Sequence, residues 1–209
     1  MLSSHPALHN KETPMAIFEF RRHSIKDGPT SATIGPRGCA LARAVGVRQL
    51  RGRGFTDYFV SGLWRTHQTL AAFGEGAGDF RLKYAPAVPP LYLARSDILD
   101  LWAACHAAEK RGEDMVKTAC DRDPEAFVKL SREFAELFKD WARTMPGSAR
   151  VLVVGHSPQI EMTAFGLSGT MVYGLRECQG VRIALGKDLL LEQGTDDLDP
   201  APVRAALFP

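Results

Sequence analysis

A run of apolar residues near residue 150 constrains the fold of this chain more than any other feature. Residues 151–154 read Val-Leu-Val-Val with no polar residue among them, which is the pattern of a parallel strand covered on both faces. A second apolar run at 17–20 predicts another strand. Each run ends directly before a short polar motif that contains a histidine.

Segments of helical periodicity alternate with these runs. Further short strands are predicted at 58–60 and 81–83, and a closing hairpin at 180–185 and 188–192. Helices are predicted over 36–45, 63–73, 96–105, 124–141 and 157–167. Strands that alternate with helices favour an α/β sandwich with a mostly parallel sheet.

Local signals set the expected helix ends. Gly74 and Gly76 are expected to end the helix that begins at residue 63. Ser96 is an expected N-cap, and Asp123 is expected to cap a helix with Pro124 in its first turn. The apolar stripe of that last helix runs from Phe127 to Trp141, which predicts that it packs on the core.

A length of 209 residues fits a single domain. We predict that this domain covers 15–209 with a helical insertion at about 84–147, and that residues 1–14 form a flexible extension. A net charge of +2 gives no reason to expect nucleic-acid or membrane binding. Four cysteines without CxxC spacing indicate reduced thiols, and no apolar run is long enough to span a membrane. These features predict a cytoplasmic protein.

Two histidines and two arginines fall where a site is expected. Ligands of such sheets bind at the carboxyl ends of the strands. Arg22 and His23 follow the first predicted strand, His156 follows the strand at 151–154, and Arg65 begins a predicted helix. Their order along the chain favours a common site, although each residue alone is more often a structural histidine or a surface arginine.

These residue types suit phosphoryl chemistry without a metal. The planar fork of an arginine donates two parallel hydrogen bonds to an oxyanion, so Arg22 and Arg65 could hold a phosphoryl group. A neutral histidine can attack phosphorus, and a protonated one is a further donor. Ser24 and Ser157 are candidate hydroxyl donors to the same phosphate.

The motifs resemble those of the histidine phosphatase superfamily, which includes the phosphoglycerate mutases. Arg22-His23-Ser24 is similar to the family's Arg-His-Gly signature. Residues 34–46 are similar to its Leu-Thr-x-x-Gly-x-x-Gln-Ala segment, and residues 61–69 to its Ser-x-Leu-x-Arg-x-x-Gln-Thr segment. The form Gly-His-x-Pro-x-Ile-Glu at 155–161 is most like the small SixA-type phosphohistidine phosphatases.

The resemblance implies a three-layer α/β/α sandwich and a metal-independent phosphatase without a cofactor. It implies that His23 is the nucleophile and becomes a phosphohistidine, and that Arg22, Arg65 and His156 complete the phosphate pocket. The expected substrate is a phosphorylated small molecule or a phosphoprotein, cleaved at a phosphomonoester or phosphoramidate bond.

Departures from the family pattern leave alternatives open. Ser24 replaces the usual glycine, and residues 25–28 lack the mutases' Ser-x-x-Trp-Asn continuation, so a phosphomutase is the weaker prediction. No glutamate motif supplies a proton donor. Asp97 is the candidate general acid, with a helix-dipole role in a first turn as its alternative. A binding protein that keeps the anion pocket without turnover is the second hypothesis.

Other polar residues have plain interpretations. His67 and His106 are expected to be surface or packing residues. Glu161 could orient the helix that follows His156 or contact Arg22, and a solvated helix face is the alternative. Residues 196–199 are expected to form a solvated acidic turn.

Overall fold

The structure is a computed structural model that describes residues 16–28, 30–79, 89, 99–185 and 189–208. Several expectations fall outside these residues: the extension over 1–14, the strand at 81–83, the cap at Ser96 and the acid at Asp97.

The described residues form one five-stranded sheet. Its strands are β1 (Ala16–Arg22), β2 (Asp57–Val60), β3 (Arg150–Gly155), β4 (Gly180–Leu185) and β5 (Leu189–Gln193), in the order β2-β3-β1-β4-β5. The pairs β1–β3 and β2–β3 are parallel, while β4 runs antiparallel to both of its neighbours. The prediction of a mostly parallel α/β sheet is therefore confirmed.

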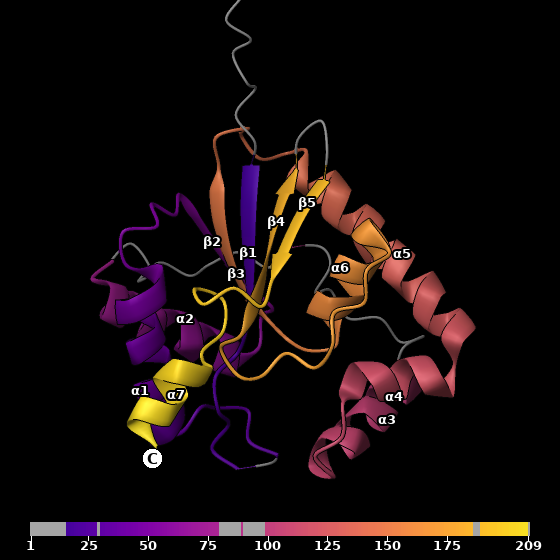
Figure 1. The fold of residues 1–209 in the computed structure, drawn as a ribbon, viewed down its shortest axis with the longest axis horizontal. Coiled ribbons are helices and arrows are strands. Elements are labelled where there is room, and N and C mark those ends of the chain that lie inside the picture. The colour runs from indigo at the N-terminus through magenta and orange to yellow at the C-terminus, as the bar shows by residue number, and fades with distance from the viewer. Residues whose placement is uncertain (1–15, 29, 80–88, 90–98, 186–188, 209) are drawn as a thin grey trace, which may run out of the picture.

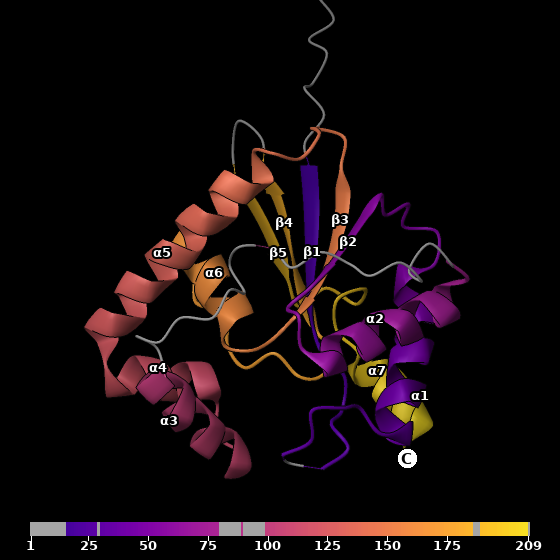
Figure 2. The ribbon, with the colours of Figure 1, turned by 180° about the vertical axis from the view of Figure 1, so that it is seen from behind.

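Helices cover both faces of this sheet (Figures 1 and 2). On one face lie α1 (Pro36–Val45), the π-helix η1 (Gly46–Leu50), α2 (Trp64–Ala77) and α7 (Ala201–Leu207). On the other lie α5 (Pro124–Ala142) and α6 (Gln159–Ser168). The pair α3 (Leu99–Lys110) and α4 (Met115–Arg122) lies beyond the carboxyl end of β1, on the α5 side.

The side chains of β3 show why an unbroken apolar run forms a central strand. Val151 and Val153 belong to one apolar cluster, which contains Phe18 and residues of α5. Leu152 and Val154 point the other way, into the cluster of α1 and α2. Because successive strand residues alternate between faces, a strand packed on both sides needs apolar residues at every position.

One expected helix end is wrong. α2 continues through Gly74 and Gly76 and ends at Gly78, which has the left-handed φ of 74° typical of a helix C-terminus. Gly76 serves packing instead, since a Cβ there would lie 2.0 Å from the carbonyl oxygen of Arg43 in α1. The missing side chain lets the two helices approach closely.

The helical insertion contains a longer first helix and one more helix than the sequence indicated. The helix expected at 96–105 is described from Leu99 and runs on to Lys110, and α4 was not predicted. The cap of α5 is confirmed, because the Asp123 carboxylate accepts from the backbone N–H of Ala126 at 2.9 Å. Leu101 and Phe134 of this insertion share a cluster with β1 and β3, so these helices pack on the core of the sheet.

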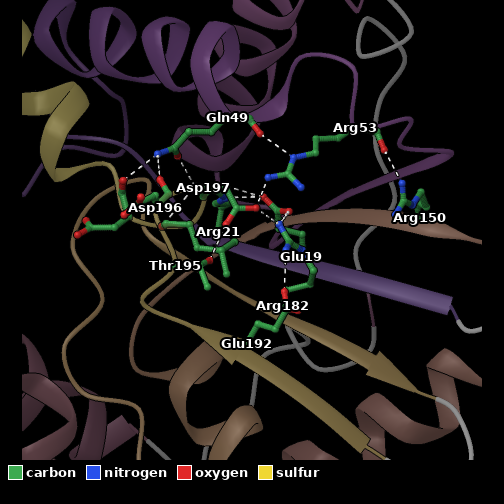
Figure 3. Close-up of polar contacts among 12 residues, drawn as sticks. Glu19, Arg21, Gln49, Arg53, Arg150, Arg182, Glu192, Thr195, Asp196 and Asp197 are labelled. Carbon is green, nitrogen blue, oxygen red and sulfur yellow. Dashed lines mark hydrogen bonds and ion pairs between the residues drawn. The ribbon is translucent and has the colours of Figure 1, made fainter.

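A buried polar network fixes the chain beside the predicted site (Figure 3). Arg21 is completely buried and donates to Glu19, Gln49 and the backbone oxygens of Cys178 and Asp197. Asp197 is ion-paired with Arg53 and Arg182, so the expected solvated turn at 196–199 is wrong at this residue. The network ties the C-terminal segment to β1, one residue before Arg22.

Candidate active site

The sheet brings the two predicted histidines together. His23 and His156 are the first residues after β1 and β3, two adjacent parallel strands in which Arg22 pairs with Gly155. The His23 backbone N–H donates to the Gly155 carbonyl oxygen at 3.0 Å, and the two imidazole rings lie 5.0 Å apart between centroids. Residues separated by more than 130 positions in the chain thus share one end of the sheet.

A backbone carbonyl sets the tautomer of His23. Its Nδ1 lies 2.7 Å from the Ser24 carbonyl oxygen, which can only accept, so Nδ1 carries the proton and Nε2 keeps its lone pair. Ser24 is held in turn, since its N–H donates to the Thr69 hydroxyl and its hydroxyl donates to the Gly38 carbonyl. The imidazole of His23 is therefore oriented through a buried, hydrogen-bonded residue.

The ring of His156 is oriented by groups from the start of α2. Its Nε2 lies 2.6 Å from the Ser61 hydroxyl, and its Nδ1 lies 3.4 Å from Nη2 of Arg65. Because a guanidinium only donates, the contact with Arg65 needs a lone pair on Nδ1 and places the proton on Nε2. The predicted arginine and the second histidine are thus in direct contact.

Burial and neighbouring cations keep both rings neutral. Burial, together with the charge of Arg22, lowers the pKa of His23 to about 3. Burial also holds the pKa of His156 well below its usual range, aided by His23 and Arg65. A neutral imidazole is the form that can act as a nucleophile.

The described residues leave some donors of the two arginines without an acceptor. Arg22 Nη1 donates to the Leu175 carbonyl at 2.7 Å, and its Nη2 is ion-paired with Glu109. The Nε atoms of Arg22 and Arg65 are buried, and neither has a hydrogen-bond partner among the described residues. Unpaired buried N–H groups are costly, which indicates a site for an acceptor that the described residues do not supply.

Glu161 connects the two halves of the site. It is fully buried, accepts from the Ser157 hydroxyl next to His156, and accepts from the backbone N–H of Leu175. The Leu175 carbonyl oxygen in turn accepts a hydrogen bond from Arg22. The Glu161 carboxyl group therefore connects the loop that carries His156 with the residue that holds Arg22. Burial raises the pKa of this carboxyl group. The alternative of a solvated helix face for Glu161 is wrong.

Glu109 is the site residue that sequence reasoning missed. It lies near the end of α3, and its carboxylate contacts Arg22, Lys26 at 3.2 Å and His106 at 3.7 Å. The nearby His106 ring, together with the charges of Arg22 and Lys26, holds the pKa of Glu109 far below its usual range. Arg22 and Glu109 are 87 positions apart, and no local sequence pattern predicts a contact over that separation. The predicted helical insertion indicates only that some residue between 84 and 147 could reach the cationic site.

Arg65 and Glu109 line an open pocket of about 650 Å³. Its described lining consists of Lys26, Thr30, Ser31, Arg65, His106, Glu109, Lys110 and Glu177. Cationic and polar side chains therefore dominate this lining, and two of its members contact the site, Arg65 at His156 and Glu109 at Arg22. Within the described residues, no group of three His, Cys, Asp or Glu side chains is placed to hold a metal ion.

The structure brings Arg22, His23, Arg65 and His156 together. It gives the two predicted serines other acceptors, Gly38 for Ser24 and Glu161 for Ser157, so their contact with phosphate stays a prediction. Asp97 lies outside the described residues. All four cysteines are free thiols, and no described helix is long and apolar enough to cross a membrane.

Comparisons with known proteins bear on the fold. No protein-family model matches the chain, and no curated protein matches it in sequence. Among solved structures it is similar to a phosphoglycerate mutase from Bacillus anthracis str. Sterne, with a TM-score of 0.62, 16% identity, and coverage of 91% of this chain and 97% of that one.

Two phosphatases also match. One is phosphoserine phosphatase from Entamoeba histolytica in complex with 3-phosphoglyceric acid (TM-score 0.55, 16% identity, 88% of this chain and 100% of that one). The other is a mycobacterial glucosyl-3-phosphoglycerate phosphatase complexed with VO3 (TM-score 0.54, 15% identity, 88% and 100%). The architecture is thus phosphoglycerate mutase-like. This is the fold that the resemblance of the motifs implied.

Proposed function

We propose that this protein is a metal-independent phosphatase that hydrolyses a phosphomonoester or phosphoramidate through a phosphohistidine on His23. One observation carries the proposal: His23 donates through Nδ1 to the Ser24 carbonyl, which leaves the lone pair of Nε2 available between two arginines. The structural neighbours named for phosphatase activity support the reaction class.

In the first proposed step, the Nε2 lone pair attacks phosphorus and the bond to the leaving group breaks. Arg22 and Arg65 stabilise the charge on the phosphoryl oxygens, using the Nε–H groups that lack partners among the described residues. The Nδ1–H bond to Ser24 stabilises the ring as it gains positive charge. Water then attacks the phosphohistidine, which returns the neutral ring and releases inorganic phosphate.

The proton for the leaving oxygen needs a separate donor. Asp97 is our candidate from the sequence. Glu109 is a described carboxylate that lines the pocket and contacts Arg22, but its low pKa makes it an anion at neutral pH in the free protein. Leaving groups that depart readily, as from phosphohistidine or a phosphoramidate, need such a donor less, and the SixA-like motif form favours that class. The substrate is a phosphorylated small molecule or a phosphoprotein.

The test is hydrolysis of a generic aryl phosphate by wild type, His23→Ala and His67→Ala. We expect His23→Ala to abolish turnover and His67→Ala, on α2 outside the pocket lining, to retain it. Quenching with alkaline denaturant during turnover should trap phosphate on the wild-type chain in an acid-labile, alkali-stable form. Undiminished turnover in His23→Ala would refute the proposal.

A binding protein without turnover is the second candidate, because Glu109 already occupies a terminal nitrogen of Arg22. In that case phosphate would stabilise the fold, yet no phosphomonoester, phosphoramidate or phosphohistidine would be hydrolysed. A phosphomutase is the third and weaker candidate. It would transfer the phosphoryl group between sugar or glycerate phosphates in a direct assay.

A further inference from the structure

Glu109 forms an ion pair with Arg22, the residue that the proposed function assigns to phosphate binding. The Arg22 side chain is 10% exposed, and one of its terminal nitrogens is committed to the Leu175 carbonyl. Glu109 takes the other terminal nitrogen, and its second oxygen lies 3.2 Å from Lys26 Nζ. In the free protein, a carboxylate of the protein itself therefore offsets part of the positive charge of Arg22 and Lys26.

This arrangement has an electrostatic consequence. A buried guanidinium without a counter-ion is strongly disfavoured, so Glu109 stabilises the empty site. Phosphate bound to Arg22 would then lie within a few ångströms of a like charge. At that range, in a partly desolvated pocket, the repulsion weakens binding substantially.

The position of Glu109 allows it to move aside. It lines the open pocket of about 650 Å³, so its carboxylate can swing into that space by rotation within the side chain. The backbone of α3 is anchored by other residues of the helix, the buried Leu101, Cys105 and Ala108. Displacement of the carboxylate therefore requires no unfolding of α3.

We propose that Glu109 is a built-in competitor of phosphate: α3 holds its carboxylate on Arg22 and Lys26 when the site is empty, and phosphate binds by displacing it. The inference rests on the proposed function in one respect, that Arg22 is a phosphate ligand. Its consequence is weak retention of inorganic phosphate, the product of the proposed reaction. Glu109 thus limits product inhibition.

The test measures the Kd of inorganic phosphate by calorimetry for wild type, Glu109→Gln and a matched control, Glu113→Gln. Glu113 lies just after α3 and pairs with the exposed Arg111. We expect Glu109→Gln to bind phosphate about tenfold more tightly or better, because a like charge is removed from the site. Glu113→Gln should match wild type. In Glu109→Gln, a further Arg22→Ala change should abolish the gain.

Unchanged or weaker phosphate binding by Glu109→Gln would overturn the inference. If that variant fails to fold, Glu109→Asp serves instead, because it retracts the charge from Arg22 by one methylene. It should bind phosphate more tightly than wild type, and equal or weaker binding contradicts the proposal. The measurement needs no turnover. Tighter binding in a chain that hydrolyses nothing would refute the phosphatase alone, whereas His23-dependent hydrolysis with unchanged phosphate affinity would refute the competitor alone.

Discussion

Acidification from pH 7 to pH 5 is expected to destabilise the fold through His23. Its pKa is lowered to about 3 in the folded protein, against 6.5 for an ordinary histidine. Between these values the unfolded chain binds a proton at His23 that the folded protein does not. Stability from this residue is fully present above pH 6.5 and is lost as the pH falls below it. Linkage gives a loss of about 2 kcal/mol between pH 7 and pH 5.

Other titratable groups also contribute to the pH dependence of the free energy of unfolding, and their contributions must be separated from that of His23. The lowered pKa values of Glu109 and Asp197 place their titration below pH 5. His156 acts in the same direction as His23, since its pKa is also lowered. Glu161 has the opposite sign, because its raised pKa lets the folded protein keep a proton that the unfolded chain releases. A His23→Ala variant isolates one contribution, since its lost packing lowers stability by a similar amount at each pH.

The assay is urea denaturation of both chains at half-unit steps from pH 5 to pH 7. Wild type should lose about 2 kcal/mol more than His23→Ala over this window. An NMR titration of the folded protein should show the His23 ring still neutral at pH 5. The reasoning is refuted if both chains lose the same stability, since His23 would then titrate in the folded state at its ordinary pKa.

Two further predictions concern packing. Arg21→Met should lower the free energy of unfolding by about 3–5 kcal/mol, because it leaves Glu19 buried without that partner. The double change Glu19→Leu, Arg21→Met should cost less than Arg21→Met alone, and an equal or greater loss would contradict a charge-based penalty. Gly166→Ala should cost about 1–3 kcal/mol by thermal denaturation, since its Cβ would lie 1.9 Å from the Ser131 carbonyl of α5. Ser168→Ala, at an exposed position of the same helix, is the control. Equal melting temperatures for Gly166→Ala and Ser168→Ala would disprove the close contact at Gly166.

The sequence allowed prediction of those parts of the site that local patterns determine. His23 and His156 could be placed because each directly follows an apolar strand, and adjacent parallel strands end at the same edge of the sheet. Glu109 could not be placed in this way. Its contact with Arg22 depends on how α3 packs, and no local spacing records that packing. Asp197 was misjudged for the same reason, since its partners Arg53 and Arg182 are distant in sequence.

The donors of this site outnumber the oxygens that the Glu109 carboxylate can offer them, which favours an anion with more oxygens as the ligand. Glu109 offers two oxygens, one on Arg22 and one on Lys26. Even with this carboxylate in place, the Nε–H groups of Arg22 and Arg65 have no acceptor among the described residues. A phosphoryl group carries three non-bridging oxygens in tetrahedral directions, which suits donors that come from two elements. Its second negative charge also suits two neighbouring guanidinium groups better than the single charge of a carboxylate does. A ligand that binds here therefore gains by having more oxygens and more charge than the residue it displaces.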